Sequence, residues 1–504
     1  MKSGTETHLD VGDKGNDGVR VDGSDVRARV VGEGGNLGFT QLGRIDFSRS
    51  GGRINTDALD NSAGVDCSDH EVNIKVLLDA LVSGGRLAAD DRAGLLAEMS
   101  GEVSRLVLSD NVAQNDVLGT CRADAAASLT VHGRLIGHLE GRYGLDRAIE
   151  VLPSRKEIAA RERAEAGLTS PELATLMAHV KLALKSDLLA GDLPDSPAFA
   201  DALAGYFPRR LRESFGDAIG DHPLRREIVA TVLTNDVVDN GGITYAFRLG
   251  EEAGASSADA VRAFAVVSAV FDLPSLRRDI RDADLDAALS DDLTLFTRRL
   301  LDRASRWMLT RRPQPLAVGA EITRFRDRVA DLTPHVAGWL CGEDAENLRS
   351  RTAALVARGV PADLAGRVQL LLDRFALLDI VEIADITQRD PREVAEVYYR
   401  LGECLGLVHL LVGVSQLGRG TRWNALARLS LRDELYDTVR ALCLDVISGS
   451  EVLDTAEQKI GEWEDRNAAR LARARHTLDA VTESGEHDLA ALSVATRQLR
   501  SMVR

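Results

Sequence analysis

The sequence predicts a mainly α fold, with a small incomplete α/β segment at residues 1–79 followed by a large all-helical region at residues 80–504. Three observations support this prediction. Glycines are concentrated in the first 64 residues, apolar residues recur with helical spacing from Val72 onward, and helix-start signals repeat along the remainder. A chain of 504 residues is also too long for one core, so roughly two to four domains are expected.

The N-terminal segment shows short strand-like runs between turns. In "VRARVVGEGGN", Val26, Ala28 and Val30 alternate with arginines, and Gly32 ends the run. "SGGRINTDALDN" is a second, looser turn with a short element. A few strands without neighbours expose their backbone edges, so we expect this segment to be less well ordered than the helical region.

The helical region begins with a clear amphipathic pattern and contains repeated capping signals. The i, i+3, i+4, i+7 spacing of one buried face is shown by Ile74, Leu77, Leu78 and Leu81. Capping pairs precede three apolar runs: Ser154 with Glu157, Thr169 with Glu172, and Ser256 with Asp259 or its neighbours. Glycines in "NDVVDNGG" predict a helix end, and "TRRPQPLAVG" predicts a sub-boundary near residue 313.

Composition excludes several classes of partner. The net charge of −16 and an aromatic content of 4% argue against binding to nucleic acid or to an anionic membrane. The five cysteines are dispersed without a CxxC pair, which is typical of a reducing compartment. The N-terminus has no apolar signal region and no uninterrupted apolar run reaches about 18 residues, so a cytoplasmic protein without a transmembrane helix is expected.

The stretch "GEGGNLG" resembles a phosphate-binding loop only in part. Gly32 and Gly34 fit G-x-G-x-x-G, but Leu37 stands where the third glycine is required, so a first phosphate loop is not predicted. Glycines still allow a ligand to approach the backbone closely, and Asn36 offers a donor and an acceptor. An ordinary turn with Asn36 in a left-handed conformation is the alternative, which spacing alone favours.

The stretch "NSAGVDCSDHEVNIK" crowds six ligand-like side chains together, from Asp66 to Glu71. Asp66 and His70 are four residues apart, as metal ligands on one helix would be. However, the change of pattern predicts a helix start near Ser68, so this pair would straddle the helix entry. With no second histidine nearby, neither a metal site nor a nucleophilic pair of Cys67 and His70 is predicted.

A capping box explains the same stretch more simply. Ser68 would cap the helix, Glu71 would reach back, and Asp69 would lie in the first turn. A helix N-terminus displayed after a glycine turn can bind an anion, provided that the neighbouring carboxylate points away.

The quoted stretches resemble a known family. Residues 10–78, from "DVGDKGNDG" through "NSAGVDCSDHEVNIKVLL", resemble the end of the catalytic region of the large, bacterial-type NAD-specific glutamate dehydrogenases. The resemblance continues through "GLTSPELATLMAHVKLALKSDLL" and "HPLRREIVATVLTNDVVDNGGITYAFRLGEE" and covers essentially the whole chain. It implies that the N-terminal segment is the C-terminal remnant of a Rossmann-like NAD-binding domain.

The resemblance also implies roles for particular residues. "EGGN" and "NSAGVDCS" are similar to the family's E-G-A-N strand end and N-A-G-G-V-x-x-S helix entry. By this match Asn36 and Asn61, with Gly34 and Gly35, would contact the nicotinamide-ribose part of NAD. Ser68 would contact the side-chain carboxylate of glutamate. No catalytic role carries over to any residue of this chain.

The family's dinucleotide loop, catalytic lysines and proton-transferring aspartate lie upstream of the matched segment. None of Lys2, Lys14 and Lys75 stands in a lysine motif of the family. We therefore expect a C-terminal part of a longer enzyme of glutamate catabolism, truncated within its cofactor domain and inactive alone. The parent reaction converts L-glutamate, NAD and water to 2-oxoglutarate, ammonia and NADH.

The expected partners are these substrates and either a homo-oligomer or the missing N-terminal part of the enzyme. The alternative is a non-catalytic helical interaction or regulatory module with vestigial site residues.

Overall fold

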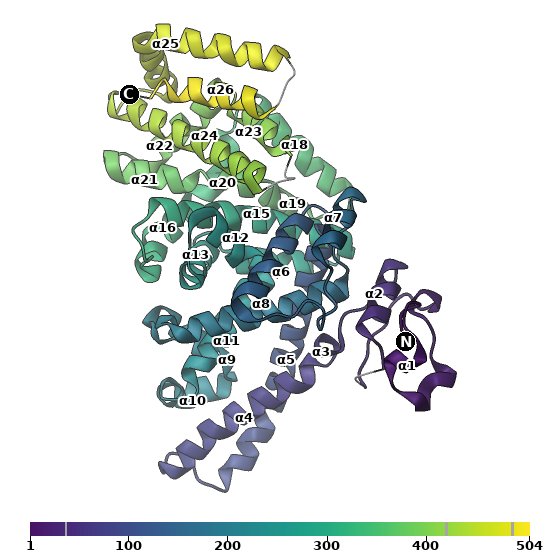
Figure 1. Cartoon of the computed structure of the whole chain (residues 1–504). Helices are drawn as coiled ribbons and strands as arrows, with labels where there is room; N and C mark the ends of the chain where they lie inside the picture. The colour runs from purple at the N-terminus through teal and green to yellow at the C-terminus, as the bar shows by residue number, and fades with distance from the viewer. Residues whose placement is uncertain (36–37, 419–421, 485–487, 504) are drawn as a thin grey trace. The chain divides into compact units, whose positions relative to one another are not determined.

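The computed structural model describes residues 1–35, 38–418, 422–484 and 488–503. The chain is 76% helical and 1% strand, and no sheet forms among the described residues. Figure 1 shows short elements at the N-terminus and long helices from α4 onward.

The elements of the first 61 residues are short. They are α1 (His8–Val11), η1 (Lys14–Val19), η2 (Gly23–Asp25), α2 (Gln41–Arg49) and α3 (Asp57–Asp60).

The next part of the chain consists of helices joined by short connections. They are α4 (Ser62–Ser83), α5 (Asp91–Ala123), α6 (Leu129–Tyr143), α7 (Arg155–Arg163), α8 (Ser170–Ala190), η3 (Leu193–Asp195), η4 (Pro197–Phe199), α9 (Ala200–Tyr206), α10 (Arg209–Gly220), α11 (Arg225–Gly241), α12 (Tyr245–Ala253), α13 (Ser257–Val270) and α14 (Leu273–Asp282).

The remaining elements are also helical. They are α15 (Ala287–Arg311), α16 (Val318–Leu332), η5 (Thr333–His335), α17 (Val336–Trp339), α18 (Gly342–Ala357), α19 (Ala362–Gln369), α20 (Leu371–Arg374), α21 (Leu377–Thr387), α22 (Pro391–Cys404), α23 (Leu407–Gln416), α24 (Arg422–Ser448), α25 (Ala456–Ser484) and α26 (Leu489–Arg500).

The prediction of an incomplete Rossmann-like α/β segment is wrong. Among the described residues the N-terminal segment has two isolated parallel bridges, Lys2 with Asp22 and Val30 with Arg53. The second bridge is closed by the Val31 N–H donating to the Arg53 carbonyl and the Arg53 N–H donating to the Arg29 carbonyl, each at 2.9 Å. The alternating run that predicted a strand therefore contributes one bridged residue, because its partner chain does not continue beside it.

A small apolar cluster holds the N-terminal segment together instead. Met1, Phe47 and Ile54 are buried, and Val26 and Phe39 pack against them with Val31. Because this cluster forms between irregular chain and one face of α2, the segment needs no sheet to bury its apolar side chains.

The helical predictions are largely confirmed. Ile74 and Leu78 are buried on α4, as are Leu77 and Leu81. Ser154 with Glu157 and Thr169 with Glu172 form capping boxes. The Ser256 Oγ likewise accepts from the Asp259 N–H at 3.2 Å. Helix α11 ends at Gly241, and Gly242 follows with φ 94°.

The chain divides into two compact units. The first comprises Met1–Phe264, Ala287–Asp292 and Pro313–Leu316, and the second comprises Ala265–Asp286, Leu293–Arg312 and Ala317–Arg504. The expected division at residue 79 lies inside α4 and stays a prediction, as does the sub-boundary near residue 313 between α15 and α16.

No single described helix is long and apolar enough to cross a membrane. Helices α22 and α23 pass this test only as a pair, with a bend of 63° between them. Val394, Val397 and Leu401 of α22 are buried, which is what a core helix of a folded domain also shows.

Candidate functional site at the start of helix α4

Hydrogen bonds from the Asn61 side chain connect the loop that follows residue 33 to the start of α4. Its side-chain amide donates to the backbone carbonyl of Glu33 at 2.7 Å and to that of Asp57 at 2.9 Å. The Glu33 N–H in turn donates to the Asp60 carboxylate at 2.9 Å. Both amide donors of Asn61 are engaged within the chain, so its side-chain oxygen is the atom that can contact a ligand.

The carboxylate of Glu33 connects the two ends of the same loop. It accepts a hydrogen bond from the Gly38 N–H and pairs with the guanidinium of Arg44. Both charged side chains are buried, and Arg44 also donates to the Asn55 carbonyl at 3.0 Å and lies 3.9 Å from the Asp60 carboxylate. We call these five residues the Glu33 clasp. It fixes both ends of the loop between residues 33 and 38 beside the N-terminus of α4.

Gly34 and Gly35 lie in this loop and are exposed. A Cβ atom at either position would meet no atom within 4 Å, so open space surrounds the backbone there. Asn36, a predicted cofactor contact, lies outside the described residues. The structure thus brings Asn61 together with the two glycines.

Ser68 does not cap the helix, so the predicted capping box with Glu71 is wrong. Helix α4 begins at Ser62, with Asn61 at the capping position. The Ser68 hydroxyl donates to the Gly64 carbonyl one turn earlier at 3.2 Å, and Glu71 pairs with Lys75. Ser68 is exposed, so its hydroxyl oxygen can still accept or exchange a hydrogen bond with a ligand.

Ser68 lies in an exposed stripe of α4 that includes two valines, with the Glu71–Lys75 ion pair beside it. Val65 and Val72, three residues before it and four residues after it, are 73% and 54% exposed. Asn61 lies on the same side, because seven residues make nearly two helical turns and advance about 10 Å along the axis. The start of α4 therefore presents one wall with an amide at one end and a hydroxyl between two valines at the other.

The helix start at Ser62 also removes one of the two reasons for rejecting a metal site at Asp66 and His70, the predicted helix entry between them. Both residues lie within α4, four residues apart, and they share one face. Asp110 of α5 lies beside them. No sequence signal joined Asp110 to this pair, because helices that are distant in the sequence meet here through packing.

Two family models match the chain. Residues 1–121 match "Bacterial NAD-glutamate dehydrogenase, catalytic domain", and residues 165–501 match "Glutamate dehydrogenase, C-terminal".

Three similar curated proteins carry the name NAD-specific glutamate dehydrogenase. The protein of Mycobacterium tuberculosis is 56% identical over 504 residues, 100% of this chain and 31% of the relative. Those of Pseudomonas aeruginosa and Halomonas elongata are 40% and 37% identical, over 100% and 99% of this chain and 31% of each relative. The chain thus spans about a third of the length of the curated relatives it matches.

Both matched models describe parts of glutamate dehydrogenases, a class of oxidoreductases. The chain belongs to the bacterial NAD-specific glutamate dehydrogenase family.

Proposed function

We propose that this chain supplies one wall of the active site of an NAD-dependent glutamate dehydrogenase. In the reaction, L-glutamate, NAD and water give 2-oxoglutarate, ammonia and NADH. Gly34, Gly35 and Asn61, with Asn36, contact the nicotinamide-ribose part of NAD, and Ser68 contacts the side-chain carboxylate of glutamate.

The observation that carries this proposal is the Glu33 clasp. It holds an open glycine loop beside Asn61, whose side-chain oxygen accepts no hydrogen bond from the described residues and can accept one from a ribose hydroxyl or a carboxamide N–H. The valines beside Ser68 support the second half of the proposal. A covering surface would dehydrate them and strengthen a hydrogen bond from the Ser68 hydroxyl to a carboxylate.

The dinucleotide loop, the water-activating lysine and the proton-transferring aspartate come from outside this chain in our proposal. The span of 31% of each relative supports this division. We expect the purified 504-residue chain to produce no NADH from glutamate and NAD. Steady turnover at a rate that scales with chain concentration would contradict this division of the site.

The role of Ser68 is tested in the complete enzyme that our proposal assigns to this chain. Loss of a hydrogen bond to a charged group weakens binding by about 1.5–3 kcal/mol, so Ser68→Ala should raise the KM for glutamate about 10- to 100-fold. The KM for NAD should stay unchanged. The matched control is Cys67→Ser, at the exposed neighbouring position. An unchanged glutamate KM in Ser68→Ala would favour a helical module with vestigial site residues.

We also propose that the enzyme works in the cytoplasm as a homo-oligomer. The five cysteines are free, and Cys67 and Cys404 are exposed, which suits a reducing compartment. Light scattering of the longer enzyme tests the assembly, and a mass equal to one subunit at all concentrations would contradict it.

A further inference from the structure

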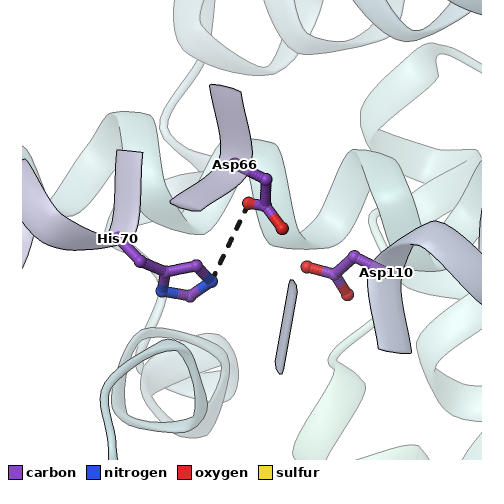
Figure 2. A group of neighbouring side chains, drawn as sticks. All are labelled: Asp66, His70 and Asp110. Carbon is purple, nitrogen blue, oxygen red and sulfur yellow. Dashed lines mark ion pairs between the residues drawn. The ribbon is translucent and has the colours of Figure 1, made fainter. Parts of the chain in front are cut away.

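Two aspartates and one histidine converge where α4 packs against α5. Asp66 and His70 come from α4 and Asp110 comes from α5, and one ligand atom of each lies within 4.8 Å of the others. Figure 2 shows the imidazole and both carboxyl groups directed toward one point between the helices. We call these residues the Asp66–His70–Asp110 cluster.

His70 is buried, and one of its two ring nitrogens has no hydrogen-bond partner among the described residues. The residue is 2% exposed, and its Nδ1 has no hydrogen-bond partner among the described residues. Its Nε2 faces the cluster and lies 3.8 Å from the Asp66 carboxylate, which is beyond hydrogen-bond distance. A buried polar group without a partner costs free energy. The Asp66 Oδ2 is also buried without a hydrogen-bond partner among the described residues, so the cluster itself holds an unsatisfied ligand atom.

The imidazole is oriented by stacking. Its ring lies parallel to that of Tyr206, with 4.2 Å between centroids and 17° between planes. Tyr206 is fixed in turn, because its hydroxyl donates to the Asp69 carboxylate at 3.0 Å and accepts from the Asn73 amide at 2.9 Å. The direction of the Nε2 lone pair is therefore set before any ligand binds.

The negative charges of the two carboxylates in the cluster are only partly balanced by neighbouring positive charges. The carboxylates of Asp66 and Asp110 lie within 4.8 Å of each other, and the carboxylate of Asp69 also acts on Asp66. Lys181 acts on both carboxylates of the cluster, but its ammonium is paired with Asp239 at 2.7 Å. Two facing carboxylates repel each other unless a proton or a cation lies between them.

From this geometry we propose that Asp66, His70 and Asp110 bind one divalent transition-metal cation of the Zn²⁺ class. An imidazole and two carboxylates are a suitable donor set, and they leave a fourth position for water. Two atoms bound to a tetrahedral Zn²⁺ are about 3.4 Å apart, so the side chains need to draw together by about an ångström. The Asp66 carboxyl is 26% exposed, which gives the cation a path from solvent.

The site is distinct from the wall that carries Ser68. Residues two positions apart on a helix point about 200° away from each other, so Asp66 and His70 lie on the face of α4 opposite Ser68. A cation here would join α4 to α5 and so fix the helix that presents Asn61 and Ser68. This role does not depend on the proposed enzymatic function.

Metal binding to the purified, untagged chain tests the proposal. After removal of metal with a chelator, Co²⁺ should bind at one equivalent per chain with a visible absorption band, and Zn²⁺ should displace it. Zn²⁺ should also raise the thermal unfolding temperature.

Substitutions then locate the site. Even outer-shell substitutions weaken metal binding about 10- to 100-fold, so Asp66→Asn and Asp110→Asn should each weaken Zn²⁺ binding at least tenfold. These isosteric changes keep the fold, which circular dichroism verifies. Glu71→Gln, an exposed carboxylate on the same helix, is the matched control and should bind Zn²⁺ as the natural chain does. No saturable binding, or equal binding by all variants, would overturn the proposal.

Discussion

At the scale of single residues, the Glu33 clasp is the contact on which the site depends most. Glu33 and Arg44 are both buried, and removing one partner of a buried ion pair costs about 3–5 kcal/mol because the other charge is left uncompensated. Glu33→Gln keeps one acceptor oxygen, so we expect a loss of about 3 kcal/mol in the free energy of unfolding. Urea denaturation measures it. Glu71→Gln should leave stability unchanged, and equal stability of both variants would contradict the importance of the clasp.

Asp379 gives a pH dependence that can be assigned to one carboxyl group. It is 2% exposed and accepts hydrogen bonds from the Trp307 indole at 2.8 Å and the Tyr398 hydroxyl at 3.1 Å. Burial is the largest cause that raises its pKa from 3.8 to about 6, against the opposing effect of these donors and of Arg440.

The sign of the effect follows from the raised pKa. Between pH 4 and 6 the folded state keeps a proton that the unfolded state releases, so this contribution is largest below pH 4 and is lost as pH rises to 6. The shift corresponds to about 3 kcal/mol. Asp379→Asn cannot titrate, so urea unfolding from pH 4 to 8 should show a smaller decline for the variant than for the natural chain. Parallel pH profiles would contradict the assignment.

At the scale of secondary-structure elements, two glycines set the packing of the N-terminal segment. Gly23 of η2 lies against α2, where an added Cβ would meet the Gly43 carbonyl oxygen inside van der Waals contact and the Phe47 nitrogen at 3.0 Å. Gly23→Ala forces backbone to move, so we expect a loss of about 1–3 kcal/mol in unfolding free energy. The control is Gly18→Ala, where a Cβ would meet nothing within 4 Å. Equal thermal stability of the two variants would contradict this account.

These glycines also explain why the element prediction failed at the N-terminus. Glycine between alternating residues is typical of strand ends, but Gly23 and Gly43 serve the close approach of irregular chain to a helix. From α4 onward the prediction succeeded, because a buried apolar stripe and a capping box are local patterns. Helix α4 begins at Ser62, six residues before the predicted start near Ser68. The prediction was wrong because Ser68 and Glu71 have the spacing of a capping box although both lie inside the helix.

The candidate site was predictable only where its residues are close in the sequence. The amide of Asn61 and the glycine loop were both identified, but the Glu33 clasp that joins them needs Arg44, which carries no local signal. Asp110, the third member of the Asp66–His70–Asp110 cluster, was not predicted for the same reason, because it is distant from the other two in the sequence. Long-range partners are fixed by packing, which a single sequence does not display.

At the scale of the whole molecule, the chain forms two compact units. Each unit is built from more than one stretch of the chain, because α13 and α15 each contribute residues to both units. A single boundary along the sequence, at residue 79 or near residue 313, cannot describe units that are each built from several separate stretches of the chain. Glycine content and proline breaks mark changes of local structure, and a unit with its own core follows from contacts between distant residues.

The two units predict separable unfolding transitions. Glu33 and Arg44 lie in the first unit, whereas Asp379, Trp307 and Tyr398 lie in the second. In differential scanning calorimetry, Glu33→Gln should lower one transition only, and Asp379→Asn should change the pH dependence of the other.

The double variant tests the independence of the two units directly. The effects of substitutions at distant sites add within about 0.5 kcal/mol, so the variant carrying both changes should show each shift at its single-variant size. A single transition that both substitutions displace together would mean that the units unfold as one cooperative body. In that case the loss caused by opening the Glu33 clasp would be shared by the entire chain, and Asn61 would be held by the stability of the whole molecule.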